Sequence, residues 1–71
     1  MIDEIKKRLH RFPFVPFGVR TFDGHEYSVP TPDHAHISPR GNRVVVYDDE
    51  VTTAILGPLH INSVIEHANG E

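Results

Sequence analysis

Proline occurs six times in this chain of 71 residues, and each proline restricts the element around it. Pro13 and Pro16 cannot lie in the interior of a helix, so any helix at the N-terminus must end before them. Pro30 and Pro32 cannot donate to a strand ladder, and we expect a sharp change of direction where they interrupt the sheet. Pro39 begins a stretch of turn residues. Short elements separated by turns are therefore predicted.

A short amphipathic helix is predicted from about Asp3 to His10. The apolar residues Ile2, Ile5 and Leu9 recur at helical spacing, with acidic residues in the first turn and basic residues toward the end. Two turns of helix do not persist alone in water. The helix must therefore dock its apolar side on the rest of the chain.

Three phenylalanines follow the helix in the segment Phe12-Pro13-Phe14-Val15-Pro16-Phe17. Exposing three aromatic rings together is unfavourable for a monomer. We therefore expect this segment to cross the core as an extended strap.

An Asp23-Gly24 turn joins two segments of alternating polarity and predicts a β-hairpin. A two-residue turn would mix polar and apolar side chains on both faces of the hairpin. A three-residue loop with Gly24 in a left-handed conformation separates them, and its pairs are Phe17 with Val29, Val19 with Tyr27, and Arg20 with Glu26. This bulged register is predicted, and in it Thr21→Val should be tolerated.

Four further strands are predicted after the proline interruption. The first runs from His34 to Ser38, and the apolar run from Val44 to Tyr47 is central because apolar residues on both faces imply cover on both. Strands from Val51 to Leu56 and from Leu59 to Ile65 follow, and the tail from His67 is expected to fray. The inward side chains are predicted to be Ala35, Ile37, Val44, Val46, Ile55 and Ile61.

These elements define a single α+β domain over residues 1–71, dominated by about five antiparallel strands. The sheet is expected to be curved or to form a partly open barrel covered by the helix. With no cysteine and a small core, packing or oligomerisation must supply the stability, which favours self-association.

The composition excludes a membrane span, because no stretch reaches the roughly 18 apolar residues that one requires. The start Met1-Ile2-Asp3-Glu4 carries acids where a secretory signal has basic residues. We therefore expect a cytoplasmic protein without membrane association.

No residue pattern indicates catalysis. Ser28, Ser38 and Ser63 lie in predicted strands without the glycine-rich elbow that positions a nucleophile. The acidic run Asp48 to Glu50 lacks the ligand spacing of a calcium loop, and the scattered glycines form no phosphate-binding loop. The chain is predicted not to be an enzyme and to need no cofactor.

His34 and His36 are the metal-ligand candidates. Two residues apart on a strand, they would point to the same face and supply two imidazoles to a metal ion. Two ligands do not complete a site, so exposed histidines are the preferred interpretation and no metal is expected.

Basic residues gather in two short segments. The candidates for phosphate contact are Lys6, Lys7, Arg8, Arg11, Arg40 and Arg43. The net charge of -3 opposes a surface adapted to nucleic acid as a whole. A solvated helix end that complements the helix dipole explains the first segment equally, and RNA binding is not favoured.

Two resemblances are carried by these motifs. Pro13-Phe14-Val15-Pro16-Phe17 and Phe22-Asp23-Gly24 resemble a set of short uncharacterised bacterial proteins with a Pro-Phe-x-Pro-Phe strap before an Asp-Gly hairpin. The segments from Arg43 to Asp48 and from Leu59 to Ile65 look like the later strands of that set. This resemblance covers most of the chain and implies a fold class without an activity.

More distantly, Val19-Arg20-Thr21-Phe22-Asp23-Gly24 resembles the first motif of the Sm-like barrel of the bacterial Hfq group. The segment His60-Ile61-Asn62-Ser63-Val64 is similar to the histidine-led last strand of that group. This resemblance implies a small Sm-like barrel and a ring-shaped homo-oligomer that holds RNA at its pore. No individual RNA-binding residue carries over.

Three functions of different class follow. The preferred one is a small non-enzymatic interaction module that self-associates and contacts another protein, because catalytic groups are lacking and strand edges are exposed. The alternative is an Sm-like RNA-binding protein that uses the six basic residues. The second alternative is a metal-binding protein built on His34 and His36. The RNA-binding alternative predicts salt-dependent RNA binding, and the metal-binding alternative predicts bound metal. The interaction module predicts neither property.

Overall fold

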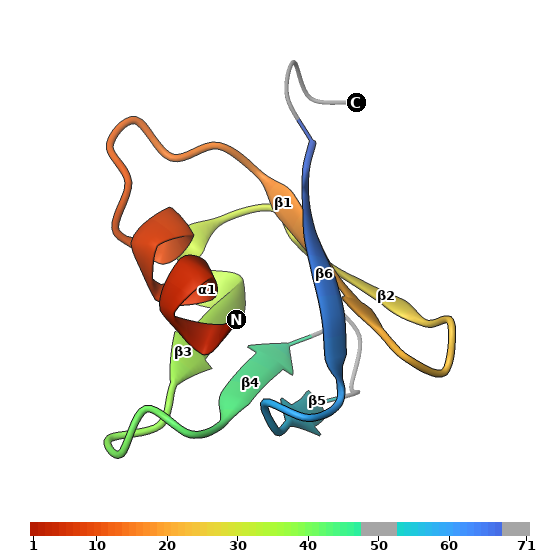
Figure 1. The fold of residues 1–71 in the computed structure, drawn as a ribbon. Coiled ribbons are helices and arrows are strands. Elements are labelled where there is room, and N and C mark those ends of the chain that lie inside the picture. Colours follow the sequence, from red (N-terminus) through yellow and green to blue (C-terminus); the bar gives the residue numbers. More distant parts are fainter. Residues whose placement is uncertain (48–52, 68–71) are drawn as a thin grey trace.

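The computed structural model describes residues 1–47 and 53–67, which form one α-helix followed by six strands (Figure 1). The helix α1 spans Ile2–Leu9. A short 3-10 turn, η1, spans Pro32–His34 and precedes the third strand. The strands are β1 (Phe17–Thr21), β2 (Glu26–Val29), β3 (Ala35–Ile37), β4 (Val44–Tyr47), β5 (Thr53–Leu56) and β6 (Ile61–Glu66).

The strands of the described residues form two three-stranded antiparallel sheets, with orders β2-β1-β6 and β3-β4-β5. This confirms the α+β class and the predominance of β-structure. The described residues contain six strands instead of about five. The segment from Pro30 to Pro32 separates β2 from β3, which join different sheets.

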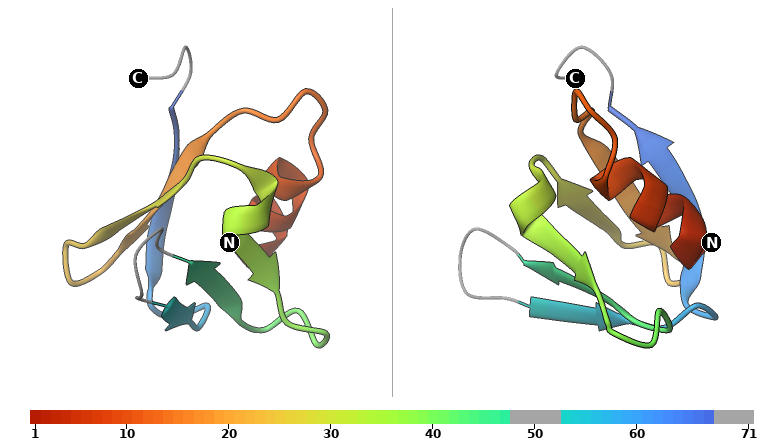
Figure 2. Two further views of the ribbon diagram at one scale, coloured as in Figure 1. Left: turned by 180° about the vertical axis from the view of Figure 1, so that it is seen from behind. Right: turned by 90° about the vertical axis from the view of Figure 1, so that its left-hand side faces the viewer.

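The helix lies between β3 of one sheet and β6 of the other (Figure 2). Its Ile5 is fully buried, and Ile2 is 6% exposed. The largest fully buried side chains come from the helix and from both sheets: Ile5, Phe17, Val19, Val29 and Val44. The docking expected for so short a helix is therefore present, and one core is shared by all three layers.

The bulged hairpin register is confirmed, with Phe17 opposite Val29 and Arg20 opposite Glu26. The Thr21 amide donates to the His25 carbonyl oxygen at 2.8 Å and closes the three-residue loop. Gly24 has a φ of 88°, which L-residues adopt at a cost.

Thr21 has a larger role in this turn than its sequence context indicated. Its side chain is buried, and the hydroxyl contacts the Asp23 carboxylate and lies 3.2 Å from the His25 carbonyl oxygen. Valine cannot make either hydrogen bond. The expected tolerance of Thr21→Val is therefore replaced by an expected loss of stability.

Five of the six side chains predicted to point inward are confirmed, since Ala35, Val44, Val46 and Ile61 are buried and Ile37 is half-buried against the core. The prediction for Ile55 was wrong, because its side chain is 66% exposed. Ile55 pairs with Val45 in the β4–β5 register, and the alternation of side chains turns Leu56 inward instead.

The phenylalanine strap is only partly interior. Phe17 is fully buried and Phe14 packs against it, with ring centroids 6.0 Å apart. Phe12 is 96% exposed, so the prediction that all three rings cross the core was wrong. Phe12 lies three residues after the end of α1, before the chain reaches β1.

We expect Gly24→Ala to lower the free energy of unfolding by about 1 kcal/mol or more, because alanine is strained at a positive φ. Gly24→Asn serves as the matched control, because asparagine adopts the left-handed conformation more readily than alanine. Urea unfolding measures both variants. Equal losses for alanine and asparagine would contradict the role of the left-handed conformation.

Candidate functional site

A groove of about 580 Å³ runs between the C-terminal half of α1 and β3 with the turn that follows it. This volume falls in the range of roughly 300–1,000 Å³ that is usual for ligand sites. We call it the α1–β3 groove, and its lining residues are Lys6, Leu9, His10, Pro32, Ala35, His36, Ile37, Ser38, Pro39, Arg40 and Gly41.

The charged side chains that line the α1–β3 groove have one sign. Its lining includes Lys6 and Arg40 as cations and two histidines, and none of the described residues that line it has a carboxylate. A neighbouring hollow shares Lys6 and His10 with the groove and adds Asp3 and Lys7. The groove is therefore suited to an anionic occupant, with one acid beyond its rim.

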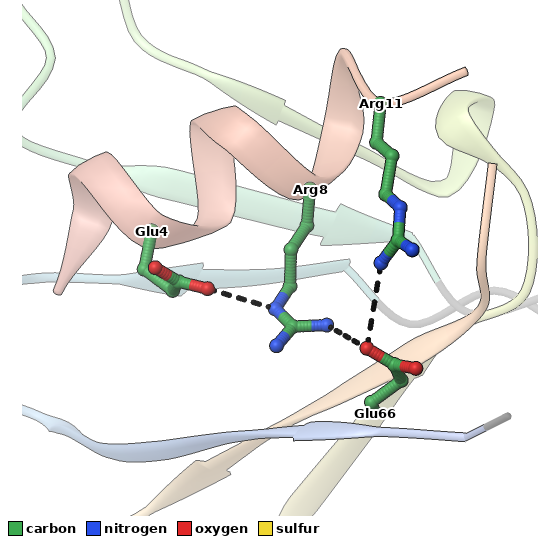
Figure 3. A network of polar contacts seen from close by, with 4 residues as sticks. All are labelled: Glu4, Arg8, Arg11 and Glu66. Carbon is green, nitrogen blue, oxygen red and sulfur yellow. Dashed lines mark hydrogen bonds and ion pairs between the residues drawn. The ribbon is translucent and has the colours of Figure 1, made fainter. Parts of the chain in front are cut away.

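Arg8 and Arg11 are directed away from this groove into a network with two glutamates (Figure 3). Arg8 Nε lies 3.1 Å from Glu4 Oε2, and Arg8 Nη1 lies 3.0 Å from Glu66 Oε1. Arg11 Nη1 reaches the same Glu66 oxygen at 3.5 Å. Arg8 therefore joins α1 to β6, and Arg11, two residues after the helix, contacts the same glutamate of β6.

The six basic residues nominated from the sequence are therefore dispersed. Lys6 and Arg40, which are far apart in the sequence, both line the groove, and Lys7 lies at the neighbouring hollow. Arg43 donates to the Asn42 carbonyl oxygen at 2.7 Å. His10 was not singled out from the sequence, because its place at the groove depends on how α1 docks beside β3.

The prediction that His34 and His36 share a strand face was wrong. His34 lies in η1, where its Nδ1 is 2.7 Å from Thr31 Oγ1. His36 lies on β3 with its Nδ1 3.1 Å from the Tyr47 hydroxyl. Thr31 also caps η1 by accepting from the Asp33 amide, so the chain forms a turn where a strand was predicted.

Within residues 1–47 and 53–67, no group of three or more histidine, aspartate or glutamate side chains is placed to hold a metal ion. The candidate serines are also separate from one another: Ser28 is on β2, Ser63 is on β6, and the Ser38 hydroxyl accepts from the Arg43 amide at 3.1 Å. The acidic run from Asp48 to Glu50 lies outside the described residues.

A second polar cluster covers Gly18 on the β2-β1-β6 sheet. Arg20 donates to Glu26 at 3.2 Å, and His67 Nε2 lies 2.9 Å from the other Glu26 oxygen. A Cβ at Gly18 would lie 2.5 Å from Glu26 Oε2, so glycine leaves the room that this carboxylate occupies. The hydrogen bond from Arg20, followed by that of His67, lowers the pKa of Glu26 below its ordinary value of 4.5.

His67 is anchored, which contradicts the expectation that the tail frays from this residue. Its amide donates to the Pro16 carbonyl oxygen at 2.8 Å, in addition to the contact of its ring with Glu26. Residues 68–71 lie outside the described part of the chain.

The outward face of the β3-β4-β5 sheet carries apolar and aromatic side chains. His36, Val45 and Ile55 form one row across the sheet, and Tyr47 lies opposite Thr53 beside it. The rings of His36 and Tyr47 have centroids 5.6 Å apart.

No known protein family, curated protein or solved structure matches the chain. Across the described residues, no helix is both long and apolar enough to span a bilayer.

We expect Glu26→Gln to lower stability near pH 6 by more than it does near pH 3. Because the folded pKa of Glu26 is below 4.5, the carboxylate stabilises the fold above that pH and loses this effect as the pH falls further. Urea unfolding across this range measures the difference. Ser28→Ala on the same strand is the control. If the stability lost in Glu26→Gln is the same at every pH, the lowered pKa of Glu26 is contradicted.

Proposed function

We propose that this protein is a small non-enzymatic interaction module that self-associates and contacts another protein. The observation that carries the first half is Ile55, which is 66% exposed on β5, the last strand of its sheet. A large aliphatic side chain beside an unpaired strand edge favours contact with another chain.

The edge of β5 is available for pairing. Across the β4–β5 ladder, Val44 pairs with Leu56, and Val46 pairs with Ala54. Hydrogen-bonded and non-hydrogen-bonded positions alternate along an antiparallel pair. The amides of Thr53 and Ile55 therefore point away from β4. Among the described residues, no hydrogen bond outside this ladder involves the backbone of Thr53 or Ile55.

A second copy is the occupant that this edge fits best. Antiparallel pairing of β5 with the same strand of a second copy is two-fold symmetric and would extend the sheet from three strands to six. The outward row of His36, Val45 and Ile55 contains no carboxylate, lysine or arginine. Two copies of a chain with net charge -3 would therefore meet without bringing like charges together there.

The remaining parts of the proposal come from the sequence. We propose a cytoplasmic location and no catalytic activity, because the sequence places no serine in a glycine-rich elbow that would position a nucleophile. An Sm-like barrel and ring remain predictions, as does the RNA-binding alternative. The engagement of Arg8 and Arg11 by Glu66 weighs against RNA binding, because it removes two of the six nominated cations.

We expect Ile55→Lys to shift the protein toward the monomer, because it adds a cation to β5 of each copy, and a charged lysine on an edge strand opposes pairing with another chain. Multi-angle light scattering over a concentration series measures the mass. Ser28→Lys is the matched control, since it adds the same charge to an exposed position of β2 on the other sheet. A monomeric wild type, or an equal shift for both variants, would contradict self-association through β5.

A further inference from the structure

The free edge of β3 faces the α1–β3 groove. Ala35, His36 and Ile37 are consecutive, and all three line the groove although alternate side chains of a strand point to opposite faces. Three successive residues can border one hollow when the edge of the strand is turned toward it. Since β3 ends the order β3-β4-β5, this edge has no neighbouring strand in the described residues.

The backbone groups at this edge follow from the register. The Ser38 amide donates to the Arg43 carbonyl oxygen at 3.0 Å, which makes Ser38 and Arg43 a hydrogen-bonded pair. His36 and Val45, two positions along, are then also a hydrogen-bonded pair. The amides and carbonyls of Ala35 and Ile37 therefore point away from β4, toward the groove.

The occupant that satisfies such an edge is an extended peptide, because added strands bind through main-chain hydrogen bonds. Its side chains would alternate between the α1 side of the groove, where Leu9 offers apolar surface, and the solvent. Lys6 and Arg40 flank this path from the helix and from the β3–β4 turn, without a carboxylate in the lining. Glutamate or aspartate at alternate positions complements them.

We propose that the α1–β3 groove binds an acidic, extended peptide segment of a partner protein as an added strand on β3. This inference rests on the proposed function, because it names the chemistry of the second protein that the interaction module contacts. Peptide binding uses the β3 edge of the sheet, and self-association uses the β5 edge on the opposite side. The two activities can therefore fail separately.

The test is a titration of the protein against a fluorescein-labelled decapeptide of alternating valine and glutamate, followed by fluorescence anisotropy. We expect binding that weakens as the salt concentration rises, and no binding of the matched valine and lysine peptide. Lys6→Glu combined with Arg40→Glu should weaken binding by about tenfold or more, since two charged contacts are reversed. Lys7→Glu is the matched control, because Lys7 lies on the same helix outside the groove lining, and it should change the affinity by less than about twofold.

Two N-methylated peptides separate strand addition from simple charge attraction. An added strand pairs through one of its edges, so methylation of the amides along one edge should abolish binding and methylation along the other should leave it intact. Equal binding of the two methylated peptides would overturn the proposal. A single-stranded RNA of equal charge that binds where the peptide does not would also overturn it.

The peptide titration is repeated on Ile55→Lys, which is expected to retain the full affinity. If Ile55→Lys keeps its affinity for the peptide and the wild type is monomeric in light scattering, the results would support peptide binding at the groove and contradict self-association. Self-association without peptide binding at protein concentrations up to about 1 mM would overturn the groove assignment alone.

Discussion

The fold depends on the burial of one side of α1 between the two sheets. Ile5 is fully buried, and a helix of two turns has no stability of its own in water. Each three-stranded sheet likewise has one apolar face that must be covered. The helix, β1 and β4 meet in the core through Ile5, Phe17 and Val44, so the loss of any one layer would expose the other two.

The docking of the helix also distributes its charges. Successive residues of an α-helix are about 100° apart, so Arg8 and Lys6 lie on opposite sides of the buried stripe formed by Ile5 and Leu9. Arg8 is held by Glu66 on β6, and Lys6 lies at the α1–β3 groove. Partly exposed ion pairs contribute about 0–1 kcal/mol, so the Arg8 network serves to orient the helix more than to hold it.

The sequence predicted those features that short-range patterns decide. The hairpin register followed from the alternation of side chains around Gly24, and the helix followed from the spacing of Ile5 and Leu9. Ile55 was misassigned because Ala54, Ile55 and Leu56 are all apolar, so their periodicity does not say which face is inward. The groove was not predictable, because Lys6 and Arg40 are brought together only by the packing of α1 against β3.

Among the described residues, β3 presents a free edge beside the cationic α1–β3 groove. Amide hydrogen exchange measured by NMR tests it directly, residue by residue along β3. The amides of His36 and Ser38, which pair with β4, should exchange slowly, and those of Ala35 and Ile37 should exchange rapidly. Uniformly slow exchange from Ala35 to Ser38 would contradict a free β3 edge, because the edge would then already be covered.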